Sequence, residues 1–246
     1  MDSETITGLK VHLVSMDEAL GTIAEWVKDR QRQRHIVTAD ASMAVIARRD
    51  PELSDIIREA DMVTPDGAGI IWASRLLRRK IVSKVSGVDL VGQLCCMSAH
   101  SGCRIFFLGA APGVAAEAAE KLRAKYPGAQ IVGTQDGYFS AKDEPGVVNT
   151  IRELAPDILL VAFGIPKQEK WIKRYKGEIG VPVSVGIGGS FDVFSGRVSR
   201  APVWMQKRGL EWLYRLAKNP KKISKVMTLP QFAILTVLTK LKMLPN

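Results

Sequence analysis

The sequence predicts an α/β fold with a Rossmann-like, largely parallel sheet covered by helices. Short runs rich in β-branched and aromatic residues alternate along the chain with longer segments of helical periodicity. One of the short runs, residues 158–163 (ILLVAF), is apolar throughout, as expected of a strand buried on both faces of a parallel sheet. The chain has 246 residues, 46% of them hydrophobic, which is enough for a sizeable core.

Six segments are predicted to be strands, because β-formers are concentrated in them between turn residues. They are residues 10–14, 35–38, 104–108, 129–133, 157–163 and 182–187. The helices are predicted between these strands, and several begin at proline, which is favoured in a first turn. They are residues 16–30 (capped by Ser15), 51–60, 67–77, 88–99, 112–126, 166–176 and 202–217.

The last 46 residues, 201–246, differ from the rest of the chain in charge. Nine of the 35 basic residues but only one of the 25 acidic residues lie in this segment, so residues 1–200 are nearly neutral. We therefore predict an α/β domain at 1–200 and a basic, helical C-terminal appendage at 201–246, called the tail below.

The tail ends in a mostly apolar segment, residues 229–244 (LPQFAILTVLTKLKML), in which Thr236, Thr239 and Lys240 fall on one side of a helix. A basic stretch followed by an amphipathic helix predicts an anchor on a membrane surface. Two other interpretations stay open: the helix packs on the protein's own core, or the basic residues bind nucleic acid. The segment is too short and interrupted to span a bilayer, and its apolar side could also pair subunits of a homo-oligomer.

The N-terminal residues, 1–4 (MDSE), are acidic and no apolar signal segment follows them. We therefore expect a cytoplasmic protein that is peripheral on the inner face of the cell membrane.

Loops rich in Gly, Pro and polar residues follow several predicted strands. They are residues 38–40 (TAD), 64–67 (TPDG), 109–113 (GAAPG), 164–169 (GIPKQE) and 188–192 (GGSFD). Ligands bind beyond the carboxyl ends of parallel strands, where backbone amides and helix N-termini can hold a phosphate. Each loop alone also suits a structural turn, and Asp66 also suits a helix N-cap. Together the loops predict a nucleotide or sugar-nucleotide pocket.

Several common motifs are absent from the sequence. It contains no P-loop, no complete Gly-x-Gly-x-x-Gly fingerprint and no Gly-x-Ser-x-Gly. It also lacks Asp-x-Asp, the simplest carboxylate pair for a divalent ion on a diphosphate. We therefore predict no metal site and no cofactor, with any bound diphosphate neutralised by amides, helix dipoles and Lys or Arg.

Many short motifs, in order along nearly the whole chain, carry a family resemblance. They are Ala60-Asp61, Thr64-Pro65-Asp66-Gly67, Gly87-Val88-Asp89-Leu90, Leu108-Gly109, Pro112-Gly113, Asp136-Gly137-Tyr138-Phe139, Gly164, Pro166-Lys167-Gln168-Glu169, Trp171, Gly188-Gly189, Phe191-Asp192, Arg200-Ala201-Pro202, Trp204, Gly209-Leu210-Glu211-Trp212 and Arg215. With them the sequence resembles the bacterial WecG/TagA/CpsF glycosyltransferases.

The resemblance implies an inverting, metal-independent enzyme of cell-wall or surface polysaccharide synthesis. Such an enzyme moves an N-acetylmannosamine-type sugar from a UDP-sugar donor to a polyprenyl-diphosphate-linked N-acetylglucosamine acceptor. Residues 1–200 would then be its catalytic domain, and the tail would bind the membrane and close the active site. The alternative from another class is a noncatalytic UDP-sugar or nucleic-acid binding protein anchored by its basic tail.

The resemblance also implies roles for individual residues. Asp66 matches the proposed base, which takes the proton from the acceptor hydroxyl, and Thr38 matches a pocket residue that contacts substrate. Gln168 matches a glutamine whose amide binds sugar hydroxyls. Gly109 and Gly113 would let backbone amides approach the diphosphate or uridine.

Asp192, Asp40 and Lys84 are further candidate binding residues. Asp192 is expected to bind a hydroxyl or a ribose, or to cap a turn. Asp40 stands where many family members have Asn, so a second carboxylate lies near the predicted base. Lys84 stands where Arg is usual, and keeps the charge for a diphosphate without the bidentate fork.

In the tail, Arg208, Arg215 and Lys222 recur every seven residues, a spacing that would share one helical face if Pro220 did not start a new helix. If the tail folds over the site, these charges meet the diphosphate. Otherwise they form a solvated or lipid-facing basic stripe.

Overall fold

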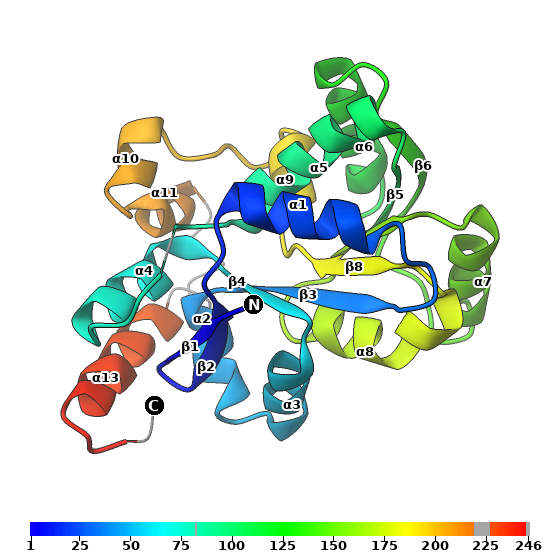
Figure 1. Cartoon of the computed structure of the whole chain (residues 1–246). Helices are drawn as coiled ribbons and strands as arrows, with labels where there is room; N and C mark the ends of the chain where they lie inside the picture. Colours follow the sequence, from blue (N-terminus) through cyan, green and yellow to red (C-terminus); the bar gives the residue numbers. More distant parts are fainter. Residues whose placement is uncertain (82, 219–226, 245–246) are drawn as a thin grey trace.

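A computed structural model describes residues 1–81, 83–218 and 227–244 of the chain. Its centre is a sheet of six parallel strands in the order β4-β3-β8-β7-β5-β6 (Figure 1). The strands are β3 (Arg34–Ala39), β4 (Met62–Pro65), β5 (Arg104–Gly109), β6 (Gln130–Gln135), β7 (Ile158–Ala162) and β8 (Val183–Gly186). The predicted α/β fold with a parallel sheet is therefore confirmed.

The sheet lies between two layers of helices, and successive strand residues face opposite layers. Phe107 and Leu160 belong to a core shared with helices α1 (Met16–Trp26), α5 (Gly87–Ser101), α6 (Val114–Lys125) and α9 (Ser190–Phe194). Their neighbours Phe106 and Leu159 belong to a core shared with α7 (Glu144–Leu154) and α8 (Lys167–Ile179). The apolar run 158–163 is thus buried on both faces, as its composition predicted.

A third core lies beside β3 and β4. It joins these strands to α2 (Ala41–Ala47), α3 (Pro51–Glu59), α4 (Gly67–Leu76) and α13 (Thr228–Lys240). The same core includes the antiparallel hairpin of β1 (Ser3–Ile6) and β2 (Leu9–His12). Thr7 and Gly8 connect the two strands with φ values of 52° and 85°, the positive values that a tight hairpin turn requires. The predicted strand at 10–14 therefore exists in part, but outside the parallel sheet.

Some helices differ from those predicted. The sequence patterns missed α2 and α9, which are short, and α7, which has Pro145 and Gly146 in its first turn. The predicted helix at 202–217 is two helices, α10 (Val203–Lys207) and α11 (Glu211–Lys218). Gly209, with φ of 73°, separates them.

This break separates Arg208 from Arg215, two residues whose seven-residue spacing would otherwise place them on one helical face. Arg208 caps the end of α10 whereas Arg215 lies within α11, so the two do not share the face of one helix. Lys222 lies outside the described residues.

Helix α13 packs against α2 and α4, and Thr236 and Thr239 of its predicted polar side are buried, whereas Lys240 is exposed. The Thr236 hydroxyl lies 3.1 Å from the Thr7 hydroxyl, and Phe232 is buried among the core residues. Ile234 and Leu241 point outward, with 60% and 62% of their surface exposed. Among the described residues, no helix is both long enough and apolar enough to cross a bilayer.

Candidate active site

Four neighbouring strands, β4, β3, β8 and β7, end at one edge of the sheet. Asp66 follows β4, Thr38 and Asp40 lie at the end of β3, Gly188 follows β8, and Gln168 follows β7. Because parallel strands share the direction of their carboxyl ends, residues far apart in the sequence meet here. Hydrogen bonds between these loops make the edge one connected unit.

Asp66 stands before the first residue of α4, but its side chain does not cap that helix. Its Oδ2 instead accepts a hydrogen bond from the backbone N–H of Gly87, at 3.1 Å. Gly87 is the first residue of α5, so the carboxylate lies close to the positive ends of two helix dipoles, which attract an anion. The same positive ends are suited to an anionic substrate group.

Thr38 is buried, and its hydroxyl donates to the backbone carbonyl of Gly186 at 2.7 Å. This bond joins the ends of β3 and β8, while the hydroxyl oxygen keeps acceptor capacity. Asp40 caps α2, accepting from the N–H of Met43 at 2.9 Å and from the hydroxyl of Ser42. Both predicted residues therefore lie at the site and also hold its backbone.

Gln168 is almost completely buried between two loops. Its Oε1 accepts from the N–H groups of Gly164 and Gly188, at 3.1 and 3.0 Å. Its Nε2 donates to Oε1 of Glu169, which is fully buried, at 2.7 Å. The pair thus fixes the loop after β7 to the loop after β8.

Gly186 shows how tightly this network is packed. A Cβ at this position would lie 2.7 Å from Gln168 Nε2 and 2.9 Å from Glu169 Oε1, closer than any side chain tolerates. The sequence analysis included Glu169 in the 164–169 loop without giving it a role, and it did not place Gly186 at the site. The adjacent polar pair Gln168 and Glu169 at a strand exit was the signal for the role of Glu169.

The chain as a whole matches the family model described as the Glycosyl transferase WecG/TagA/CpsF family, over residues 4–245. The chain belongs to this family. One similar relative, from Bacillus spizizenii, is 37% identical over 204 residues, which cover 83% of this chain and 79% of the relative. Another, from Bacillus subtilis, is 34% identical over 242 residues, covering 98% and 93%. Both are named N-acetylglucosaminyldiphosphoundecaprenol N-acetyl-beta-D-mannosaminyltransferase.

The other predicted glycine loop of this glycosyltransferase lies at the same edge of the sheet, after β5. Gly109 has φ of 114°, and a Cβ there would lie 2.7 Å from the backbone of Ala162 in β7. Gly113, with φ of 81°, precedes α6. Asp192 lies in α9, where its backbone carbonyl accepts from the N–H of Val198 at 2.9 Å and its Oδ2 lies beside Gly189.

An ion pair that the sequence did not reveal joins the glycosyltransferase core to the residue just before the tail. Nη1 and Nη2 of Arg200 donate to Oδ1 and Oδ2 of Asp89, at 2.7 and 3.0 Å, and the Ser86 hydroxyl donates to the same carboxylate at 2.6 Å. Burial would raise the pKa of Asp89, but the bonds from Arg200 and Ser86 outweigh it and hold the pKa below its ordinary value. A cavity of about 340 Å³ borders this pair.

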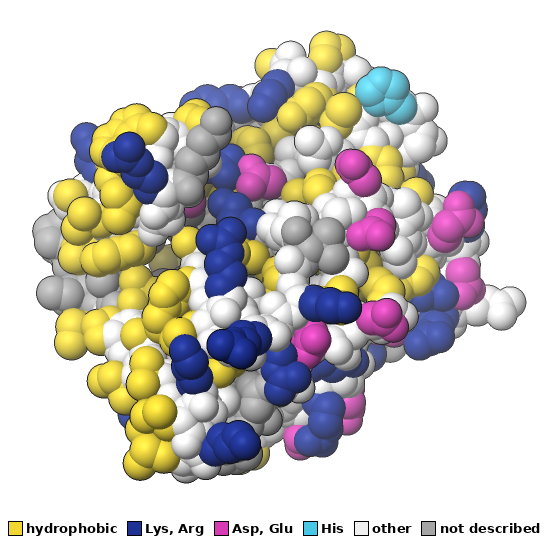
Figure 2. Space-filling view, turned by 60° about the vertical axis from the view of Figure 1, so that its left-hand side comes forward, with side chains coloured by type: hydrophobic (Ala, Val, Ile, Leu, Met, Phe, Trp, Pro, Cys, Tyr) yellow, Lys and Arg dark blue, Asp and Glu magenta, His cyan; other side chains and the backbone are white. Residues whose placement is uncertain are grey.

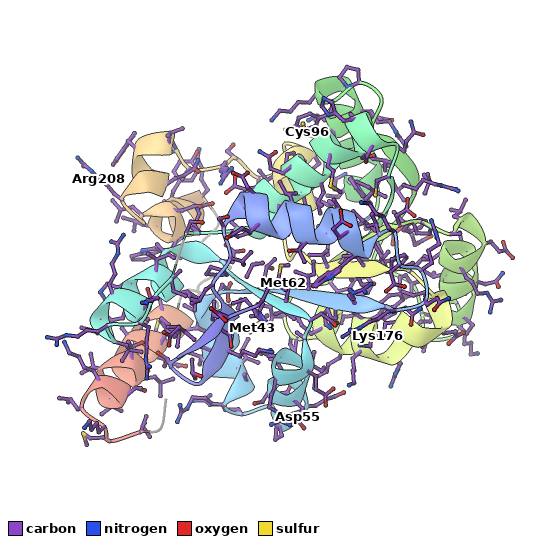
Figure 3. All side chains as sticks on the ribbon, viewed as in Figure 1. Met43, Asp55, Met62, Cys96, Lys176 and Arg208 are labelled. Atoms are coloured by element: carbon purple, nitrogen blue, oxygen red, sulfur yellow. The ribbon has the colours of Figure 1, made fainter. Side chains whose placement is uncertain are left out.

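The predicted basic binding residues Lys84, Arg208 and Arg215 lie in different parts of the molecule. Lys84 is half-buried. It lies close in space to the loop of Asp66, because the next residue, Val85, donates its N–H to the carbonyl of Pro65 at 2.9 Å. Arg208 lies over the Trp204 ring, 5.7 Å from its centroid, on the outer side of α10 (Figure 3). The Arg215 side chain lies outside the described part of the structure.

Proposed function

We propose that this glycosyltransferase moves an N-acetylmannosamine-type sugar from a UDP-sugar to a polyprenyl-diphosphate-linked N-acetylglucosamine. The observation that carries the proposal is the Asp66 carboxylate, at the edge where four strands end and beside the N-termini of α4 and α5. The names of the two Bacillus relatives support the sugar and the acceptor.

In the proposed reaction, Asp66 accepts the proton of the acceptor hydroxyl while that oxygen attacks the anomeric carbon. The new glycosidic bond forms as the bond from the anomeric carbon to the UDP oxygen breaks, and UDP leaves with the bonding electrons. One displacement inverts the anomeric carbon. The helix N-termini and Lys84 are suited to stabilise the charge that develops on the departing diphosphate. The proposed mechanism therefore uses no metal ion.

The acceptor's lipid would place the reaction at the membrane, on the inner face in our proposal. The outward apolar residues of α13 support contact with lipid, since Ile234, Val237 and Leu241 are all exposed. Gly109, Gly113, Gln168 and Asp192 remain our candidates for binding the donor, with Arg208 and Arg215 as candidates from the tail.

The proposal is tested by measuring UDP release with UDP-N-acetylmannosamine and a short-chain prenyl-diphosphate N-acetylglucosamine, in EDTA. We expect acceptor-dependent release by the wild type and a loss of about 100-fold or more in Asp66→Asn, with little change in donor affinity measured by calorimetry. Asp55→Asn is the matched control, because Asp55 lies on the surface of α3 and pairs only with Arg58 in the described structure (Figure 3).

Asp40→Asn identifies which carboxylate is the base. Asn caps a helix as well as Asp, so the fold is expected to persist, and turnover should fall much less than in Asp66→Asn. The reverse order would make Asp40 the base. Donor binding without any UDP release would instead support a noncatalytic binding protein, and a requirement for added divalent ions would contradict the metal-independent mechanism.

A further inference from the structure

A strongly basic segment without acidic residues lies within the near-neutral first 200 residues. Residues 67–88 include no Asp or Glu, and their five basic residues all follow the last turn of α4 or lie in it. They are Arg75, Arg78, Arg79, Lys80 and Lys84. The first four lie at the C-terminus of α4 and are called the basic end of α4 below, whereas Lys84 lies beside the loop of Asp66. One or two cations would be enough to complement the helix dipole at this C-terminus, so four call for a further explanation.

Most of this charge is not neutralised by the protein. Arg79 forms an ion pair with Glu4 at 3.4 Å, while Arg75, Arg78 and Lys80 form none within the described residues. Arg75, Arg78 and Lys80 are exposed. A hollow of about 320 Å³ lies between the basic end of α4 and Lys84. Arg75, Arg79 and Lys84 line it, together with Ser74, Ser83, Ile71 and Ile81. Cations and hydroxyl groups around a hollow of this size are suited to a phosphate group.

Apolar side chains surround the basic end of α4. Trp72, one turn earlier on α4, is 44% exposed, and the neighbouring α13 exposes Ile234 and Leu241. Figure 2 shows this side of the molecule, with hydrophobic side chains gathered on its left-hand part and Lys and Arg beside them. Exposed Trp and aliphatic residues next to unpaired cations are typical of a surface that binds an anionic membrane. A nucleic acid would match the cations but not the aliphatic residues of α13.

We propose that the basic end of α4 is a second membrane contact, distinct from the tail, whose hollow holds the phosphate of an anionic lipid headgroup. Helix α4 starts directly after Asp66 and has 10 residues, so it spans about 15 Å. A bilayer bound at its far end sets the distance between Asp66 and the lipid surface. This consequence for catalysis rests on the proposed function, but lipid binding can be measured without turnover.

The test is sedimentation of the full-length protein with vesicles of phosphatidylcholine, with or without 30% phosphatidylglycerol. Arg78→Glu/Lys80→Glu reverses two exposed charges outside the candidate active site. We expect its affinity for the anionic vesicles to fall about 30-fold or more, as estimated from the contribution of each cation near an anionic surface. The control Lys142→Glu/Arg152→Glu changes the net charge equally at exposed positions around α7, and should bind like the wild type.

Several outcomes would overturn the proposal. They are unchanged binding by Arg78→Glu/Lys80→Glu, an equal loss in the control, or displacement of the wild type by millimolar inorganic phosphate at constant ionic strength. The last would show that the hollow prefers a free anion to a lipid phosphate. Stronger binding to RNA than to the anionic vesicles would assign a nucleic-acid partner instead. Arg78→Gln/Lys80→Gln, which removes charge without reversing it, should show an intermediate loss and guards against misfolding of the first variant.

A measurement of turnover without vesicles tests the proposed function separately from this inference. With a soluble short-chain acceptor and no vesicles, Arg78→Glu/Lys80→Glu should keep wild-type UDP release. If the wild type itself releases no UDP, the proposed function fails, while the vesicle measurements still decide the role of the basic end of α4.

Discussion

At the scale of single residues, Gln168 already uses most of the hydrogen-bonding capacity of its amide within the protein. Both lone pairs of its Oε1 are engaged by Gly164 and Gly188, and one N–H of its amide is engaged by Glu169. Only the second N–H is left to meet a sugar hydroxyl. The accepting half of the predicted role is therefore already taken by backbone, and a substrate contact by Gln168 stays a prediction.

Gln168→Glu tests the importance of this buried pair. The variant would place a second carboxylate beside the buried Glu169, and two like charges in contact cannot both stay ionised without a large cost. We expect a loss of about 3 kcal/mol in the free energy of unfolding at pH 7, measured by urea denaturation, and a smaller loss at pH 5, where one proton can be shared. Gln31→Glu, the same change in an exposed loop, should cost less than about 0.5 kcal/mol. Equal stability of the two variants would contradict the structural role of Gln168.

His12 makes stability depend on pH. Its Nδ1 accepts from the N–H of Val63 at 2.8 Å, and burial is the main cause that lowers the pKa of His12 to about 4, with Lys10 adding to it. Because the folded pKa lies below the ordinary histidine value of 6.5, the unfolded chain binds the proton more readily. The stabilisation is complete above about pH 6.5 and is lost as the pH falls towards 4, by about 3 kcal/mol.

Urea denaturation between pH 7 and pH 4 checks this expectation. His12→Asn keeps an acceptor for Val63 without a titrating ring, so its stability should decline less steeply than that of the wild type. His100→Asn, at an exposed position near the end of α5, should decline as the wild type does. Parallel curves for all three proteins would show that His12 does not govern the acid response.

At the scale of helices and strands, the sequence was most informative where one physical pattern dominates. The run 158–163 could be predicted as a buried strand because all its residues are apolar, and β7 is buried throughout. The order of strands and the joining of Thr38 to Gly186 could not be predicted, because both depend on contacts between segments separated in the sequence, by 148 residues in the case of Thr38 and Gly186. The same holds for the link between Asp89 and Arg200, which are 111 residues apart. The partners of Gln168 are at most 20 residues away, but they depend on how two loops meet. Helix α13 was predicted as amphipathic, yet its inward side depends on Thr7 and on the rest of the third core.

Helix α13 is expected to contribute to folding through Phe232. This side chain is 2% exposed within the third core, and replacing a buried Phe by Ala typically costs 3–5 kcal/mol, so we expect about 4 kcal/mol for Phe232→Ala in urea denaturation. Ile234→Ala, on the exposed side of the same helix, should cost less than about 0.5 kcal/mol. If Phe232→Ala leaves stability unchanged, α13 is a separable appendage and not a part of the core.

At the scale of the whole molecule, charge and apolar surface are gathered on one side. Helices α4, α10, α11 and α13 lie together in Figure 1, and their exposed large apolar residues include Trp72, Trp204, Trp212 and Leu241. The opposite side, around α7 and α8, carries mixed charges, several of them in ion pairs such as Lys173 with Glu59. The division at residue 200 is a division in composition, and its use as a domain boundary stays a prediction.

If α13 contacts a membrane, as we propose, its two-sided packing also determines how the protein leaves that membrane. An anchor joined only by a linker can stay in the lipid while the body swings away. Here Phe232 holds the inner side of the helix in the core while Ile234 and Leu241 occupy the outer side. A bilayer that takes up Ile234 and Leu241 therefore takes hold of the catalytic body at a fixed tilt, and release requires the whole molecule to desorb at once.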